Sequence, residues 1–270
     1  MYPLYHVLCQ RVLTEGQLVA PATYSTRELR GVEIQTAVGE MPTRIHFNPR
    51  LAIVEGLALV AGIPQRDAVA AVAPKVNPLL FTAQAAYGPR LMDQMPHIIN
   101  ELAHDPDSRR AVGVISRSYE TASASLPCAQ LVQFLIRDDA LFAQVYMRSS
   151  DLIWGLPYDI VQFGFLTACL ARCFTSSSDG DPIIPVDVCF HLASAHIYAS
   201  TAHLAPVTPP SRLQLFQLQS IVPRKWPHLR EWANDCLQAI IRTGNIKGHG
   251  IDLVSSPLLW PTKTLEAPYG

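Results

Sequence analysis

The sequence has 270 residues, of which 49% are hydrophobic, enough to bury a sizeable core in one large domain or two small ones. Its 21 Lys and Arg nearly balance its 22 Asp and Glu, so no global basic field is available to wrap a nucleic-acid backbone. A small anionic ligand is compatible with this balance, because it needs only a local cluster of arginines.

The cysteine pattern indicates no disulfide framework, since none of the 6 cysteines forms a CxxC pair in this long chain. No run of about eighteen apolar residues is present, and polar Gln10 and Arg11 lie near the start. We therefore expect neither a membrane span nor a signal peptide. A reduced, cytoplasmic setting follows, in a host cell if the chain is viral.

Periodicity and turn residues divide the chain into interleaved helices and strands. We expect helices over 1–18, from Pro49 to Gly62, and over 91–104, 158–174 and 226–242. We expect paired strands within 24–47, a buried strand over 111–116, and strands over 130–136, 141–148 and 186–192, the last leading into 195–198. The order lacks a strict βαβ rhythm, which favours an α/β or α+β fold.

Cys128 follows Pro127 just ahead of the apolar strand. A lone cysteine beside a strand is most often an inert core residue. At the mouth of a strand with arginines nearby, it is instead a candidate nucleophile, because cations lower a thiol pKa.

Two arginine clusters are candidates for holding an anion. Arg109 and Arg110 follow a turn of Asp, Pro and Ser, where a solvated charge pair is the plain alternative. Arg148 and Ser149 end a strand, and a guanidinium fork with a hydroxyl suits the oxygens of a phosphate.

Three further polar residues have both a plain and a functional interpretation. Asp159 lies at the start of an apolar helix, where an N-cap is the plain explanation. His196 and Tyr198 alternate along an extended segment and so face one side, although a buried histidine with satisfied hydrogen bonds fits as well.

The remaining histidines and cysteines give no functional pattern. No Cys or Glu completes a zinc-ligand spacing with His191, His196 or His203, so we expect no metal site. Cys169 and Cys173, four apart on an apolar helix, fit the core.

The order of these motifs resembles the thymidylate synthase family. They run as Asp-Pro-Asp-Ser-Arg109-Arg110, Leu-Pro-Cys128, Gln133-Phe134, Tyr-Met-Arg148-Ser149-Ser-Asp151, Gly155-Leu-Pro-Tyr-Asp159 and Ala-His196-Ile-Tyr198. Cys128 lies twenty residues before Arg148 and thirty-one before Asp159, and both spacings match the family without gaps. Glu55 and Ala86-Tyr87-Gly88 are further landmarks, whereas the ends of the chain match weakly.

The resemblance implies a fold and a reaction. The fold is one catalytic domain over 1–270, with a large mixed sheet flanked by helices and a dimer formed through a sheet face. Cys128 adds to C6 of a pyrimidine nucleotide and makes C5 nucleophilic, and Glu55 organises water and proton transfers. The carbon donor is 5,10-methylenetetrahydrofolate.

The resemblance also implies binding roles for the other matched residues. Those assigned to the nucleotide are Gln133, Arg148, Ser149, Asp151, Asp159, His196 and Tyr198, with Arg109 and Arg110 reaching the phosphate from the partner of a homodimer. Those assigned to the folate are Asp151, Trp154, Gly155 and Tyr158.

Asp159 is the departure that bears on the substrate, because thymidylate synthases carry Asn at this position. Uracil offers the carbonyl O4 and an N3–H donor, whereas cytosine offers an N4 amine donor and a bare N3 acceptor. An Asp accepts from the amine, and a protonated Asp also donates to N3. The phage deoxycytidylate hydroxymethylases, relatives of thymidylate synthase, use Asp here, so the resemblance points to that branch.

Other departures affect the product and the phosphate site. Residues 63–86 contain no Trp to shield a methylene intermediate from water, although Trp154 or Phe81 can take that place. Ala129 replaces the usual His after the cysteine. Ala22 stands where the family has a phosphate-binding Arg, with Arg27 or Arg30 as substitutes, and 258–270 have no clear match to the family's closing segment.

We therefore expect a homodimeric deoxycytidylate (dCMP) 5-hydroxymethyltransferase. A dCMP methyltransferase that also uses the folate as reductant is the nearest alternative, followed by a hydroxymethylase of CMP or dUMP. A non-catalytic nucleotide-binding homologue is the alternative from another class.

Overall fold

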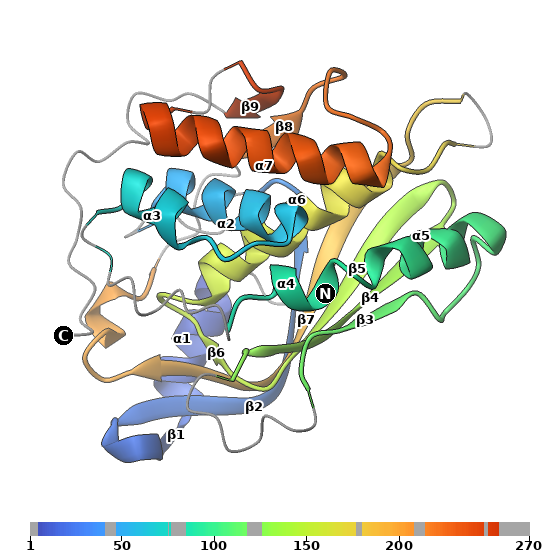
Figure 1. Cartoon of the computed structure of the whole chain (residues 1–270). Coiled ribbons are helices and arrows are strands. Elements are labelled where there is room, and N and C mark those ends of the chain that lie inside the picture. The colour runs from blue at the N-terminus through green and yellow to red at the C-terminus, as the bar shows by residue number, and fades with distance from the viewer. Residues whose placement is uncertain are drawn as a thin grey trace.

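The fold is built on a seven-stranded mixed sheet. The computed structural model describes residues 5–40, 47–74, 76, 85–117, 126–176, 180–207, 214–245 and 248–253. The strand order is β1-β2-β7-β5-β4-β3, with β6 beside β7 (Figure 1). The strands are β1 Gln17–Val19, β2 Thr26–Ala37, β3 Val112–Val114, β4 Ala129–Arg137, β5 Ala140–Met147, β6 Ser150–Asp151 and β7 Ile184–Tyr198. Strands β5 and β6 run parallel to β7 and the other neighbours are antiparallel, which confirms the predicted mixed sheet.

Helices cover the sheet in layers. The α-helices are α1 Tyr5–Glu15, α2 Pro49–Ala61, α3 Arg66–Val72, α4 Gly88–Leu91, α5 Met95–His104, α6 Leu156–Ala171 and α7 Trp226–Thr243. Helix α6 packs on β5 and β7, α2 packs on α6, and α7 lies outside α2 (Figure 1). The 3-10 helices η1 (Pro21–Thr23) and η4 (Ala202–Leu204) and a small sheet of β8 (Phe216–Leu218) and β9 (Ile251–Leu253) complete the described elements.

Local sequence explains why α2 begins and ends where it does. The Asn48 side chain accepts hydrogen bonds from the backbone N–H groups of Arg50 and Leu51, and Pro49 occupies the first turn. Gly62 ends the helix in the left-handed conformation, with φ 76°. Almost every residue between is apolar and buried, so the carboxylate of Glu55 is carried into the interior.

Two expected strands differ from the structure. Residues 24–47 do not form a strand pair within the described part of the chain, because β2 is one long strand that pairs with β7 along its length. The strand within 111–116 is a short edge strand with one buried residue, Gly113, and not a buried strand. The strands expected over 130–136 and 141–148 are confirmed as β4 and β5, and Asp138 and Asp139 between them both adopt positive φ, as a tight two-residue turn requires.

The expected helices are confirmed with shifted bounds. The predicted 1–18 helix is described as α1, and its last residues instead enter β1. The predicted 91–104 helix is α5 from Met95 to His104, whereas Leu91 is the last residue of α4. In the part of the chain that the structure describes, no helix is long and apolar enough to cross a membrane.

Candidate active site

Cys128 lies at the mouth of β4, where the end of β5 returns to it. The backbone N–H of Arg148 donates to the Cys128 carbonyl at 2.9 Å. The Arg148 guanidinium donates from Nε to Pro127 O at 3.1 Å and from Nη2 to Leu126 O at 3.0 Å. Arg148 therefore holds the segment that presents the thiol, while its side chain stays largely exposed.

The pKa of the Cys128 thiol is raised, contrary to the expectation that nearby arginines lower it. Burial raises its pKa to about 11, and the charge of Asp159 adds to this shift. Arg148 acts in the opposite direction but does not overcome burial. The expectation from sequence was wrong because it counted nearby charges and not the depth of the site.

In addition to burial, the charges of Asp159, Cys128 and Glu55, which all lie close to Tyr87, raise the pKa of its hydroxyl. Burial raises the pKa of Asp159 to about 7, opposed by a hydrogen bond from Tyr87. Burial raises the pKa of Glu55 to about 8, and the charge of Asp159 contributes. Among the described residues, no hydrogen-bond partner reaches Glu55 Oε2. The site therefore contains two carboxyl groups that titrate near neutral pH.

The helix position of Asp159 excludes the N-cap explanation. Helix α6 begins at Leu156 with Gly155 as its N-cap residue, so Asp159 lies inside the first turn. Its carboxyl group points instead toward Tyr87, whose hydroxyl also lies 3.4 Å from the backbone nitrogen of Ala129. Tyr87 thus joins Asp159 to the residue that follows the thiol.

His196 and Tyr198 lie together on β7, as their alternation predicts. Their rings meet edge to face with centroids 5.1 Å apart. Strand β6 places Asp151 opposite His196, and the Leu152 N–H donates to the His196 carbonyl at 2.9 Å. Burial lowers the pKa of His196 while Asp151 opposes that shift, so burial favours the neutral imidazole.

The residues assigned to the folate gather where β6 leads into α6. A Cβ at Gly155 would lie 3.0 Å from the Asp151 carbonyl oxygen, closer than most side chains tolerate. The Tyr158 hydroxyl accepts a hydrogen bond from the Asn48 N–H at 3.1 Å. Trp154 is half-buried and packs against the core.

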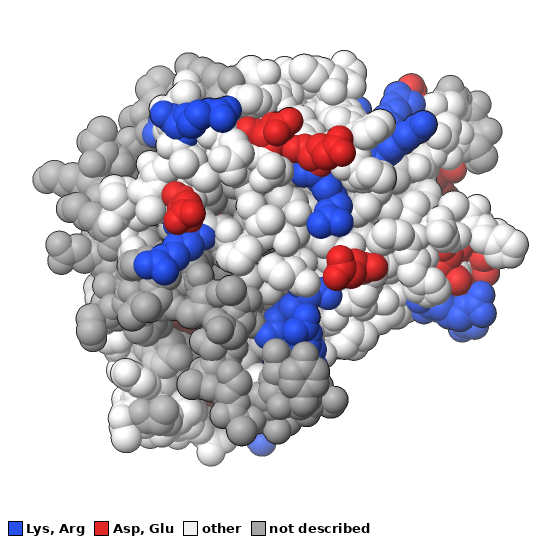
Figure 2. Space-filling model, in the orientation of Figure 1, with Lys and Arg blue, Asp and Glu red and all other residues white. Residues whose placement is uncertain are grey.

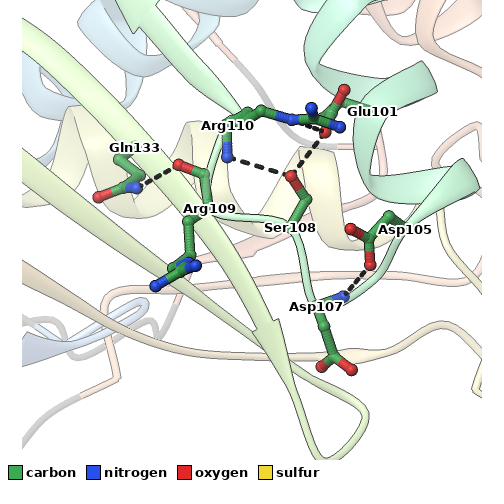
Figure 3. Close-up of polar contacts among 7 residues, drawn as sticks. All are labelled: Glu101, Asp105, Asp107, Ser108, Arg109, Arg110 and Gln133. Carbon is green, nitrogen blue, oxygen red and sulfur yellow. Dashed lines mark hydrogen bonds and ion pairs between the residues drawn. The ribbon is translucent and has the colours of Figure 1, made fainter.

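Arg109 and Arg110 lie apart from this cluster, beyond the turn before β3, and have different surroundings (Figure 3). Glu101 accepts from Arg110 Nε at 2.9 Å and from the Ser108 hydroxyl at 2.6 Å. In the described chain, the Arg109 guanidinium makes no ion pair or hydrogen bond, and it points away from Glu101 in Figure 3. Of the two arginines, Arg109 is therefore the more available to bind an anion.

Gln133 lies with Arg109 and not with Cys128. Its amide donates to the Arg109 carbonyl at 2.8 Å, across β3 and β4. The same outward face of the sheet carries a groove of about 470 Å³ whose lining includes Gln130, Tyr146 and Arg148. The groove therefore lies on the exposed face of the sheet and extends to Arg148, just after the end of β5.

The open face also carries a polar cluster that histidine spacing did not predict. The β2–β7 register places Glu33 opposite His191, and Cys189 lies two residues away on the same face. His191 Nδ1 lies 2.8 Å from Glu33 Oε1, and its Nε2 lies 2.7 Å from Gln144 Oε1. Both ring nitrogens of His191 are therefore engaged in hydrogen bonds, and the ligand atoms of Glu33, Cys189 and His191 lie within 4.8 Å of one another.

Surface charge is dispersed on the face shown in Figure 2, where Lys and Arg alternate with Asp and Glu. Arg27, expected as a substitute phosphate ligand, donates to the Gly16 carbonyl at 3.1 Å at the α1–β1 junction. The side chain of Ala22, Phe81 and the segment 258–270 lie outside the described structure.

Comparison with known proteins shows the family of the chain. The sequence profile described as thymidylate synthase matches residues 77–224, more than half of the chain. The chain belongs to the thymidylate synthase family. It is 32% identical over 151 residues, or 54% of its length, to the thymidylate synthase of human herpesvirus 8 type P (isolate GK18). That match covers 39% of the viral protein, so the chain spans well under half of this relative.

Proposed function

We propose that the protein transfers a one-carbon unit from 5,10-methylenetetrahydrofolate to C5 of dCMP, with water completing a 5-hydroxymethyl group. The observation that carries this proposal is Asp159, a buried carboxyl whose pKa of about 7 keeps a protonated fraction near neutral pH. A protonated carboxyl donates to cytosine N3 and accepts from the N4 amine. Facing uracil in that arrangement, it would set its donor against N3–H and its acceptor against O4.

Cys128 carries the covalent step in this proposal. The thiol passes its proton to the water that Glu55 organises as its sulfur bonds to C6, the ring becomes nucleophilic at C5, and C5 attacks the methylene carbon. The C5 proton leaves, elimination of the folate leaves an exocyclic methylene, and water adds to that carbon. The Cys128–C6 bond then breaks and restores the aromatic ring.

The surrounding residues bind and orient. Arg148 and Ser149 suit the nucleotide phosphate, since a guanidinium fork and a hydroxyl match its oxygens. His196 and Tyr198 suit the sugar hydroxyl, and Glu55 suits the movement of water and protons at the ring. Arg109 and Arg110 reach the phosphate of the second subunit in a homodimer. Asp151, Trp154, Gly155 and Tyr158 line the folate side.

Trp154 favours one alternative product. A half-buried indole beside the site can shield the methylene from water, in which case the folate delivers a hydride and the product is 5-methyl-dCMP. Incubation with dCMP and methylenetetrahydrofolate separates the two reactions. Hydroxymethylation gives the heavier product and tetrahydrofolate, whereas methylation gives dihydrofolate. A product formed from dUMP and not from dCMP would overturn the base assignment.

A further inference from the structure

Tyr87 is held in one place by contacts on both sides of the site. Its ring stacks on Phe163 with centroids 5.7 Å apart and 29° between the planes. Phe163 lies one helical turn after Asp159 on α6, so this stacking sets the Tyr87 hydroxyl beside the Asp159 carboxyl. Among the described residues, the other titratable groups around Asp159 are Glu55 and Cys128.

The hydroxyl of Tyr87 has a fixed direction of donation. The backbone N–H of Ala129, 3.4 Å away, can only donate, so the Tyr87 oxygen is the acceptor in that contact. A phenol has a single proton, and among the described residues the remaining partner of the hydroxyl is Asp159. Tyr87 therefore donates to one Asp159 oxygen and makes that oxygen an acceptor.

Which oxygen of a neutral carboxyl group carries the proton decides which base it matches. With the proton on the oxygen facing N3, the group fits cytosine. With the proton on the other oxygen, it donates to O4 and accepts from N3–H, which fits uracil as an amide does. A protonated Asp159 consequently distinguishes the two bases only when its proton is confined to one oxygen.

We infer that Tyr87 is a specificity-positioning residue, which fixes the proton of Asp159 on one oxygen and thereby sets the choice between cytosine and uracil. This inference rests on the proposed function for the base that is chosen. The hydroxyl of Tyr87 occupies the oxygen that accepts from the cytosine amine, and the other oxygen keeps its proton for N3.

Binding of dCMP and dUMP to four proteins tests the inference without requiring turnover. They are the wild type, Tyr87→Phe, Asp159→Asn and the double variant, measured by calorimetry at pH 6, where Asp159 is mostly protonated. The ratio of the dUMP Kd to the dCMP Kd should fall about tenfold in Tyr87→Phe, the usual effect of one buried hydrogen bond. In the Asp159→Asn background, Tyr87→Phe should leave the ratio unchanged, because an amide has no proton to confine.

An unchanged ratio in Tyr87→Phe would overturn the inference, as would an equal change in the Asp159→Asn background. Should Tyr87→Phe fail to fold by circular dichroism, Phe163→Leu provides a second test, since it removes the stacking that places the hydroxyl and should lower the same ratio. The proposed function fails separately, if the wild type prefers dUMP. The Tyr87 inference is decided by the change in the ratio, whichever base the wild type favours.

Discussion

Asp159 and Glu55 face each other between α6 and α2, and the charge of Asp159 helps to raise the pKa of the Glu55 carboxyl to about 8. Among the residues that the structure describes, neither group has a cationic partner, and only hydrogen bonds from Gln65 to Glu55 and from Tyr87 to Asp159 lower their pKa values. Two such carboxyl groups near a partly buried thiol suit acid–base chemistry at neutral pH. The proposal assigns them different tasks: Asp159 reads the base, and Glu55 handles water and protons.

Asp159 should reduce the stability of the protein at high pH. Its pKa is about 7 in the fold against an ordinary value of 3.8, so the fold disfavours the ionised form. The contribution of Asp159 to the free energy of unfolding is therefore most favourable below about pH 4, and it falls as the pH rises toward 7. Asp159→Asn should exceed the wild type in free energy of unfolding by about 4 kcal/mol at pH 8.

The comparison uses urea unfolding of both proteins at pH 4.5 and pH 8, with Asp105→Asn, an Asp in the exposed turn before β3, as a control. The gap between Asp159→Asn and the wild type should widen from the lower to the higher pH. A constant gap would mean that Asp159 is not held with a raised pKa.

Cys128 should be indispensable for exchange at C5. Cys128→Ala removes the sulfur that bonds to C6, so release of tritium from C5-labelled nucleotide should fall by more than about a thousandfold. Cys173→Ala is the matched control, because Cys173 is a free, partly buried thiol beyond the far end of α6. Equal tritium release from Cys128→Ala and the wild type would leave a binding-only homologue as the better account.

Arg148 should contribute both to phosphate binding and to the placement of the thiol. Arg148→Ala should weaken dCMP binding by about thirty- to a hundredfold, since charge-assisted hydrogen bonds to the phosphate are lost. Binding of deoxycytidine, which has no phosphate, should change little. Arg137→Ala, at the opposite end of β4, is the control. Parallel losses for nucleotide and nucleoside would instead show that Arg148 acts only through the segment before Cys128.

Arg109 should matter more than Arg110, because Arg110 is already paired with Glu101 within its own chain. If Arg109 serves the partner's site, mixing inactive Arg109→Ala and Cys128→Ala proteins should restore about a quarter of the wild-type activity. Random exchange makes half of the dimers mixed, and each mixed dimer has one intact site. A mixture as inactive as its components would show that Arg109 acts within its own chain.

Local sequence was sufficient for those elements whose ends carry their own signals. Asn48, Pro49 and Gly62 delimit α2, and Asp138 and Asp139 turn the β4–β5 hairpin. The pairing of β2 was missed because alternation shows which residues face one side, and not which strand lies alongside. Its true partner, β7, lies far along the chain.

The residues of the candidate site could be named from the sequence, but their burial and their contacts could not. The resemblance to the thymidylate synthase family pointed to Cys128, Arg148 and Asp159, whose spacing matches that family. It could not show that burial outweighs Arg148 at the thiol, nor that Tyr87 reaches Asp159 from a separate segment. Both facts depend on packing between α6, α2 and the sheet, which sequence spacing does not contain.

The ratio of kcat/KM for dCMP to that for dUMP, with methylenetetrahydrofolate as carbon donor, tests the central claim most directly. If Asp159 reads cytosine, dCMP should be favoured by at least about a hundredfold, because a mismatched base leaves buried polar groups unpaired. Turnover of dUMP with little or none of dCMP would contradict the account.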